Sequence, residues 1–330
     1  MSYHHFTPLE REALERLIRL GKTKKEIAEI LGRHRGTIRR ELLRNRDLDG
    51  KYKCAIASVF YWDRRKRCYV KSKLGDEALM LRVQDELKEK WSPEQIAGRW
   101  RVVAYPKDPS HWISHESIYR YIRADKAAGG KLYLHLRRGH KRFNPKAKAG
   151  CDMGRIKNRK SIEERPGEVA ERIEVGHWEA DTVKLNGEDG QCMVTAVERS
   201  IGILFGGRMP DNSAQSMNEA LTRALAPVPE KLRRTLTVDN GKEFAWFAQL
   251  ETTLGIQVYF AHPYSAWERG LNENTNGLLR QYFPKKKNLG TLTDEEIQYA
   301  INALNNRPRK RLNYQTPLER YAQVLGALGT

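Results

Sequence analysis

Hydrophobic positions in the first fifty residues recur at helical spacing. Capping boxes at residues 7–10 and 23–26 precede two short amphipathic segments, and a glycine follows each segment. A third helix is predicted over residues 34–45. Two short helices, a glycine turn and a third helix form the pattern of a helix-turn-helix domain, which we predict over residues 1–50.

The same periodicity returns further along the chain. Residues 77–90 carry apolar positions at helical spacing, residues 92–95 form another capping box, and Ser114 precedes a further amphipathic run. We therefore predict a second helix-turn-helix domain over residues 75–125. Residues 51–74 are helical in pattern and rich in arginine and aromatic side chains, and we predict that they connect the two domains.

The pattern changes twice beyond residue 125. Residues 126–168 lack apolar periodicity and are rich in glycine, lysine, arginine and proline, which predicts a basic linker. Three strand-like runs then follow one another and lead into helix, strand, helix and strand. This order predicts an α/β domain of ribonuclease-H type with a mixed five-stranded sheet over residues 169–330.

Charge divides the chain in the same way. Residues 1–160 hold 40 Lys and Arg against 19 Asp and Glu, whereas residues 161–330 hold 20 against 22. A basic helical half favours nucleic acid as the partner, because no apolar run approaches the ~18–20 residues of a membrane span. No signal-peptide pattern begins the chain, and the four cysteines form no CxxC pair for zinc. We expect a soluble, cytoplasmic protein.

Basic and small polar residues gather on the third helix of each predicted helix-turn-helix. A helix in that position can lie in the major groove of double-stranded DNA, where arginine pairs with guanine edges or with phosphates. The sequence leaves open which of the two applies, and a solvated basic helix in an ordinary bundle is the alternative. The predicted DNA contacts are Arg33, Arg35, Thr37, Arg39 and Arg40 in the first domain and Ser114, His115, Ser117 and Arg120 in the second.

Three acidic residues occupy positions that the predicted sheet could bring together. Asp181 falls in the first predicted strand, Asp239 directly follows the fourth, and Glu273 lies in a later helix, 33 intervening residues after Asp239. Carboxylate oxygens hold divalent ions, and two such ions about 3.5–4 Å apart can activate an attacking oxygen and stabilise a leaving one. We therefore predict a site for two Mg²⁺ ions, which Mn²⁺ could replace.

Other interpretations of these acids remain open at this point. Asp181 could be a sheet-edge residue, and Asp239 in its Asp-Asn-Gly sequence could serve only to form a turn. Glu268 competes with Glu273 for the third position. Two further acids are near in sequence: Glu179 shares the strand face of Asp181 and could assist or form a salt bridge, and Glu243 is assigned to local turn structure.

The segments around the three acids resemble a known family. WEADTV, VDNGKEFA and HPYSAWERGLNENTNGLLRQYFPK are similar to the DDE transposase and retroviral-integrase superfamily, and specifically to the bacterial insertion-sequence-thirty family. RGTIRREL, SPEQIAGRW, ISHESIYRYI and NNRPRKRLNYQTPLE extend the resemblance over nearly the whole chain. The family's spacing between its second Asp and its Glu is matched by Asp239 and Glu273, and its basic residue seven positions later falls on Arg280.

The resemblance implies a DNA transposase. Such a protein would bind the terminal inverted repeats of an insertion sequence and catalyse Mg²⁺-dependent strand cleavage and strand transfer, as at least a dimer on DNA in the bacterial nucleoid. It implies catalytic and metal-binding roles for Asp181, Asp239 and Glu273. A non-catalytic DNA-binding regulator with an integrase-like scaffold is the alternative. The residues expected to contact DNA beside the acids are Arg280, Asn240, Asn276, Lys285 and Lys286.

Overall fold

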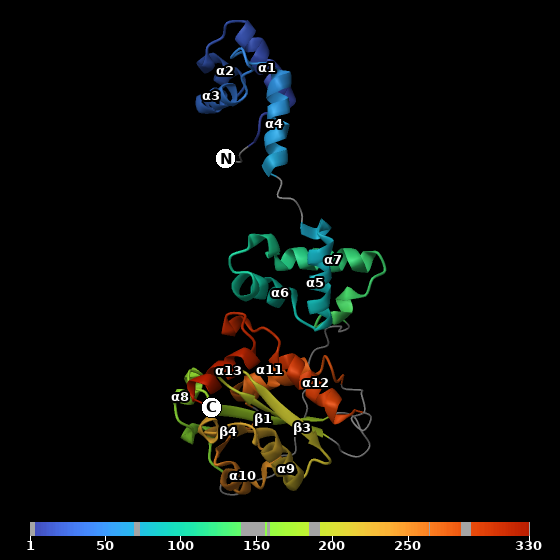
Figure 1. Ribbon diagram of the computed structural model, residues 1–330. Coiled ribbons are helices and arrows are strands. Elements are labelled where there is room, and N and C mark those ends of the chain that lie inside the picture. Colours follow the sequence, from blue (N-terminus) through green and yellow to red (C-terminus); the bar gives the residue numbers. More distant parts are fainter. Residues whose placement is uncertain are drawn as a thin grey trace. The chain divides into compact units, whose positions relative to one another are not determined.

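The chain divides into two compact units, Met1–Ser72 and Lys73–Thr330. No helix within the described parts of the chain is both long and apolar enough to cross a membrane. The computed structural model (Figure 1) describes residues 4–68, 73–139, 156, 159–184, 192–263, 265–284 and 292–329.

The first unit is built from helices. α1 (Pro8–Arg19), α2 (Lys24–Ile30) and α3 (Arg35–Arg44) form the predicted three-helix pattern, and both capping boxes are present. Leu14 and Ile38 are fully buried in the core between them. The first predicted helix-turn-helix is therefore confirmed.

A fourth helix, α4 (Cys54–Cys68), packs along α1. The Cys54 amide donates a hydrogen bond of 2.8 Å to a carboxylate of α1, and the Arg11 guanidinium lies 4.5 Å from the centre of the Tyr61 ring. The predicted connector at residues 51–74 is thus mostly part of the first unit. Tyr61 contributes to this difference, because its ring lies against Arg11 of α1.

The second unit begins with a helical bundle, residues 73–139. Its main helices are α5 (Glu77–Lys88), α6 (Pro93–Arg99) and α7 (His115–Ala127), in the order predicted for the second helix-turn-helix. Trp100, which follows α6, is almost fully buried in the bundle core. The apolar positions of all three helices therefore face a common interior.

The bundle extends into the region that was predicted to be a linker. A 3-10 segment (Leu132–His135) follows α7, and Leu132, Tyr133 and Leu136 pack against the bundle core. The predicted linker of residues 126–168 is therefore wrong at its start. A 3-10 segment of this length is too short to produce a recognisable apolar period.

The sheet domain, residues 156–329, contains a mixed five-stranded sheet. Its order is β3-β2-β1-β4-β5, in which β1, β2 and β3 are antiparallel while β4 and β5 run parallel to β1. This topology confirms the predicted fold and places β4 beside β1. The strands are β1 (His177–Lys184), β2 (Cys192–Glu198), β3 (Leu204–Met209), β4 (Thr235–Val238) and β5 (Gln257–Phe260).

Helices cover both faces of this sheet (Figure 1). α9 (Ala214–Leu225) and α10 (Phe247–Leu254) pack against one face, and α11 (Gly270–Leu279) and α12 (Asp294–Asn305) against the other. α13 (Pro317–Ala327) follows and joins the core on the side of α9. Two hydrophobic layers therefore enclose the strands.

The predicted linker is also wrong at its end. A 3-10 segment (Ile162–Glu164) and α8 (Glu168–Glu171) precede β1. Ser161 forms a parallel bridge with Phe260, whose amide donates a hydrogen bond of 2.9 Å to the Lys160 carbonyl. This segment therefore satisfies the edge of β5 and belongs to the sheet domain.

Candidate active site

Asp181 and Asp239 are brought together by the pairing of β1 with β4. The two strands run parallel with Glu179 opposite Thr237, so the positions two residues further along each chain are also neighbours. Asp181 lies in β1 on the face covered by α11, because alternate residues of a strand point to opposite faces. Asp239 is the first residue after β4.

Arg269 lies between these two carboxylates. Its Nη2 atom is 3.0 Å from Asp239 Oδ2, its Nη1 atom is 3.7 Å from Asp181 Oδ1, and Nη1 also donates to the Ala180 carbonyl at 3.2 Å. The guanidinium therefore partly neutralises the aspartate pair. Arg269 was not among the predicted site residues, although its position one helical turn before Glu273 is a signal that could have found it.

Burial raises the pKa of the Asp181 carboxyl to about 6. The positive charge of Arg269 opposes this shift, while the negative charges of Asp239 and Glu243 add to it. A buried carboxylate with acidic neighbours gains from a bound cation, which would favour its ionised form. The two aspartates thus have the chemistry expected of divalent-metal ligands.

Glu243 is closer to this pair than a purely local turn role would require. It is buried in a 3-10 segment (Lys242–Phe244) after β4, and its Oε1 atom accepts a hydrogen bond of 3.2 Å from the Thr182 hydroxyl. Thr182 is the residue after Asp181. The assignment of Glu243 to turn structure therefore misses its contact with β1, which only the folded sheet creates.

Glu268 and Glu273 have different surroundings. Glu268 accepts a hydrogen bond of 2.8 Å from the His262 amide and lies 2.8 Å from the Nδ1 atom of the same histidine. Glu273 is exposed on α11, on the helix face that it shares with Arg269 and Asn276. Glu268 is thus occupied in holding the loop after β5, whereas Glu273 lies on the helix that borders the aspartate pair.

Two of the three predicted metal ligands lie together, and the third does not. Within the described residues, no three Asp, Glu, His or Cys side chains are grouped closely enough to hold a metal ion. The aspartate pair satisfies the chemistry of such a site, whereas Glu273 lies on a helix that borders it.

Asn276 holds the Asp181 side chain. Its Nδ2 atom donates a hydrogen bond of 3.1 Å to Asp181 Oδ2, and its Oδ1 atom accepts one of 3.1 Å from the Thr195 hydroxyl. Asn276 was predicted to contact DNA, but the structure gives it a partner within the acidic site instead. It therefore fixes the orientation of the carboxylate.

Glu179 anchors α11 to β1. The fully buried carboxylate accepts a hydrogen bond of 2.9 Å from the Asn272 amide, in the first turn of α11, and pairs with Arg199. The Asn272 side-chain amide also donates a hydrogen bond of 2.9 Å to the Glu179 backbone carbonyl. The salt-bridge interpretation of Glu179 is confirmed, and its effect is to position the helix that carries Glu273.

The remaining residues predicted to contact DNA near the acids have varied surroundings. Asn240 is buried. Its side chain donates a hydrogen bond of 2.8 Å to the Ala261 carbonyl and accepts one from Arg159, so it is not available to DNA in this structure. Arg280 donates a hydrogen bond of 2.7 Å to the Lys184 carbonyl, and burial lowers the pKa of the Arg280 guanidinium. Lys285 and Lys286 lie outside the described residues.

The predicted contacts of the first helix-turn-helix fall into two groups. Arg35, Arg39 and Arg40 are exposed on α3, and Thr37 is half-buried there. Arg33 precedes the helix and forms a salt bridge of 2.8 Å with a carboxylate of α1, which ties the start of α3 to that helix. The exposed arginines on α3 are the ones that remain free to approach DNA.

The second helix-turn-helix shows a similar division. Ser114 is the N-cap of α7 and accepts a hydrogen bond of 3.1 Å from the Ser117 amide. His115 and Arg120 are exposed, and Arg120 lies 3.9 Å from the carboxylate of Glu116. Capping therefore accounts for the Ser114 side chain, and the Ser117 hydroxyl lies 2.9 Å from Ser114 Oγ, while His115 and Arg120 retain exposed polar groups.

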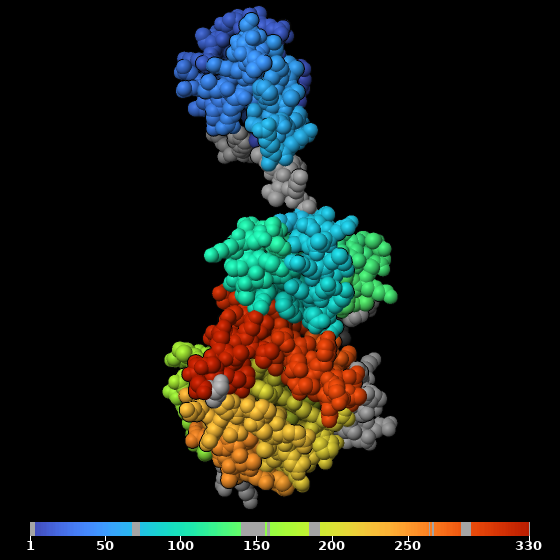
Figure 2. Space-filling view, in the orientation of Figure 1, coloured from blue at the N-terminus to red at the C-terminus, as the bar shows by residue number. Residues whose placement is uncertain are grey.

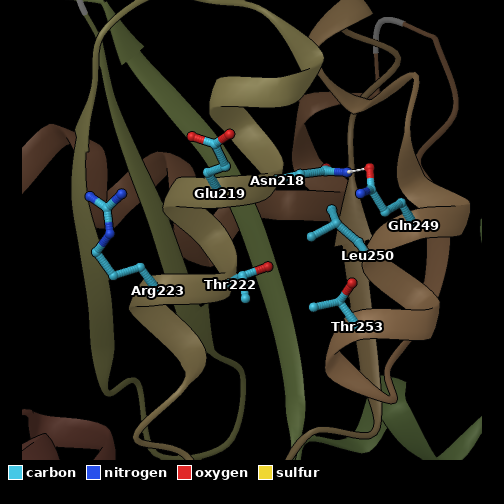
Figure 3. Close-up of a pocket in the computed structure, with 7 residues that line it drawn as sticks. All are labelled: Asn218, Glu219, Thr222, Arg223, Gln249, Leu250 and Thr253. Atoms are coloured by element: carbon cyan, nitrogen blue, oxygen red, sulfur yellow. Dashed lines mark hydrogen bonds between the residues drawn. The ribbon is translucent and has the colours of Figure 1, made fainter.

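A separate cavity lies between α9 and α10, against the sheet face opposite to α11 (Figure 3). It has a volume of about 470 Å³, and Asn218 donates a hydrogen bond of 3.2 Å to Gln249 at its wall. None of the predicted site residues lines it. The acidic pair therefore remains the candidate active site. The lining residues are Asn218, Glu219, Thr222, Arg223, Gln249, Leu250 and Thr253.

Comparisons with known proteins identify two kinds of domain in the chain. The family model described as a helix-turn-helix domain matches residues 2–45, and the model described as an integrase core domain matches residues 171–266. The second match includes Asp181 and Asp239 and ends before Glu273. Both halves of the chain thus have recognised relatives.

Curated relatives match the chain over nearly its full length. The transposase for insertion sequence element IS4351 of Bacteroides fragilis is 38% identical over 322 residues, covering 97% of this chain and 96% of the relative. The transposase for IS1086 of Cupriavidus metallidurans is 36% identical over 326 residues, which cover 98% of this chain and 96% of the relative. Transposase InsI for IS30A of Escherichia coli K12 is 38% identical over 328 residues, which cover 96% of this chain and 82% of the relative.

Proposed function

The chain belongs to the insertion-sequence transposases of the IS30 type, and we propose that it cuts and joins DNA at a divalent-metal site formed by Asp181, Asp239 and Glu273. The observation that carries this proposal is the β1–β4 pairing, which sets the two aspartates side by side on the face covered by α11. A DNA-binding half and a carboxylate site in one chain suit an enzyme that acts on DNA phosphodiesters.

The residues around the acids have distinct tasks in this proposal. Asp181 and Asp239 would hold the metal, with Glu273 as the third ligand. When bound, two Mg²⁺ or Mn²⁺ ions would activate a water or a DNA 3′-hydroxyl and stabilise the leaving oxygen. Asn276 keeps the Asp181 carboxylate oriented, and the guanidinium of Arg269 supplies positive charge beside the reacting phosphate.

DNA recognition is assigned to the helical parts of the chain. The exposed arginines of α3 would contact the terminal inverted repeats, and the exposed residues of α7 would also contact DNA. Because two element ends must be joined, we propose at least a dimer on DNA. A DNA substrate of this kind places the protein in the cytoplasm with the nucleoid.

The proposal is tested with labelled end DNA and Mg²⁺. Asp181→Asn, Asp239→Asn and Glu273→Gln should each keep end binding in a gel-shift assay while cleavage and strand transfer fall by more than about 100-fold. Glu268→Gln is the matched control, because Glu268 holds His262 and should leave the activity within about threefold of wild type. Full activity of the Glu273→Gln protein would refute the assignment.

A further inference from the structure

One face of α6 is fastened to the C-terminal part of the sheet domain. Arg99 forms two hydrogen bonds with Glu319, Nη1 to Oε2 at 2.7 Å and Nη2 to Oε1 at 2.5 Å. The Arg99 Nη1 atom also donates 3.2 Å to the Tyr314 carbonyl. Glu319 itself is fixed in the capping box at the start of α13. A paired arginine and carboxylate of this kind defines both distance and orientation.

Further contacts flank this pair along residues 308–319, which we name the clasp segment. Gln95 Nε2 donates 2.8 Å to the Pro308 carbonyl, and Lys310 Nζ lies 2.6 Å from Glu94 Oε1. The contacting positions on α6 recur one helical turn apart, so they form a single face. In Figure 2 the surfaces of the bundle and of the C-terminal elements adjoin in this region.

Gly98 shows how close the approach is. A Cβ atom at this position would lie 2.1 Å from the Tyr314 ring, which is far inside van der Waals contact. Tyr314 itself has a φ of 61°, a left-handed conformation that is unusual for a tyrosine. The absence of a side chain at Gly98 and this backbone shape together allow α6 and the clasp segment to meet.

The bundle also reaches the helix that carries Glu273. Arg137 Nη1 donates a hydrogen bond of 3.1 Å to Asn274 Oδ1 on α11, and Lys90 Nζ lies 5.6 Å from the centre of the Tyr282 ring. Within the described residues, no hydrogen bond or ion pair links α7 to the sheet domain. Docking through α6 leaves His115 and Arg120 of α7, the predicted DNA-binding helix, exposed.

We propose that the clasp segment holds α7 at a fixed distance from Asp181 and Asp239, and thereby sets where DNA is cut relative to the sequence that α7 binds. This inference rests on the proposed function. Several contacts act in parallel between the α6 face and the clasp segment, so that the bundle and the active site move together. A bundle joined to the sheet domain only by a flexible linker would instead hold DNA at variable distances from the two aspartates.

The first test reverses the central charge pair in the full-length protein. Arg99→Glu and Glu319→Arg each place like charges together, so hydrogen exchange of the α6 amides should become at least about tenfold faster. The same variants should cut end DNA at several neighbouring phosphodiesters. Combining both substitutions restores opposite charges and should return exchange and cut position toward wild type.

Two further variants make the test independent of that charge pair. Gly98→Ala keeps α6 helical, because alanine favours helices, but its Cβ meets the Tyr314 ring; it should loosen docking and spread the cut positions. Reversal of the exposed Asp85–Lys88 pair on α5 is the control and should change neither readout. Cut positions like those of wild type in Gly98→Ala and in both single charge variants would overturn the inference.

The two proposals fail in different ways. If the proposed function is wrong, no protein in the series, including wild type, yields Mg²⁺-dependent cuts, whereas hydrogen exchange still reports docking. If only the clasp inference is wrong, the wild-type and variant proteins cut at the same position although exchange in α6 differs. Failure of the double charge reversal to restore a single cut position counts against the clasp inference as well.

Discussion

Asp181 carries the main electrostatic conflict of the site. Its burial favours the neutral acid, the guanidinium of Arg269 favours the carboxylate, and the nearby acids Asp239 and Glu243 again favour the neutral form. The result is a carboxyl whose pKa is raised to about 6. Burial of this carboxyl beside two other acids therefore costs stability when Asp181 is ionised.

The pH dependence of stability should report this conflict. A carboxyl with a raised pKa contributes stability that is present below its unfolded pKa of about 4 and is lost as the pH rises through about 6. Asp181→Asn removes that loss. Without Mg²⁺, wild type should therefore lose up to about 3 kcal/mol of unfolding free energy relative to the variant between about pH 4 and pH 7.

Urea unfolding of both proteins across this range measures the difference directly. Titrating groups that do not interact with Asp181 are shared by the two proteins, so their contributions cancel in the comparison. A wild-type protein that gains stability over Asp181→Asn as the pH rises would contradict the prediction. That result would mean that Arg269 outweighs burial at this carboxyl.

At the scale of elements, α11 depends on one buried carboxylate. Glu179 accepts the amide of Asn272 in the first turn of the helix, where the partial positive charge of a helix terminus favours an anion. It also pairs with the buried Arg199. Because Asn276 and Glu273 lie on the same helix, Glu179 positions both.

Removal of this carboxylate should be costly. Glu179→Ala leaves Arg199 buried and unpaired, so we expect the free energy of unfolding to fall by about 3–5 kcal/mol. Glu174→Ala is the control, because Glu174 pairs with Arg234 at a much more exposed position and should cost about 1 kcal/mol or less. Chemical denaturation compares the two, and equal losses would argue against an anchoring role for Glu179.

At the scale of the whole molecule, charge and chemistry are separated. The net positive charge belongs to residues 1–160, whereas the sheet domain holds nearly balanced charge around its acidic site. Affinity for the DNA backbone is thereby assigned to the helical parts. The acids of the sheet domain do not have to overcome phosphate repulsion alone, because the helical parts hold the duplex.

The salt dependence of end binding should follow from this separation. Replacing Arg35, Arg39 and Arg40 with alanine should weaken binding and lower the slope of log K against log salt by about 0.9 for each phosphate that these arginines neutralise. Arg223→Ala, on the exposed surface of α9, is the matched control. Fluorescence anisotropy at several salt concentrations measures the slope. An unchanged slope in the triple variant would remove α3 from the DNA interface.

Much of this organisation follows from local pattern. The capping boxes and apolar periods predict α1, α2, α3, α5 and α6 because these signals depend on residues within one or two helical turns. The succession of strands and helices predicts the mixed sheet, and its topology implies that Asp181 and Asp239 are neighbours. The predicted linker fails where packing, rather than periodicity, orders the chain.

The sequence by itself determined the fold class and the family, and it predicted the three acids, because each of these inferences depends on periodicity, motif or spacing along the chain. Only the tertiary structure decided that Arg269 lies between the aspartates, that Asn276 and Asn240 are engaged inside the protein, and that Glu268 is bound to His262. The contacts between α6 and the clasp segment were likewise visible only in the tertiary structure. These contacts link residues distant in sequence or depend on the direction of a side chain, which pattern along the chain does not specify.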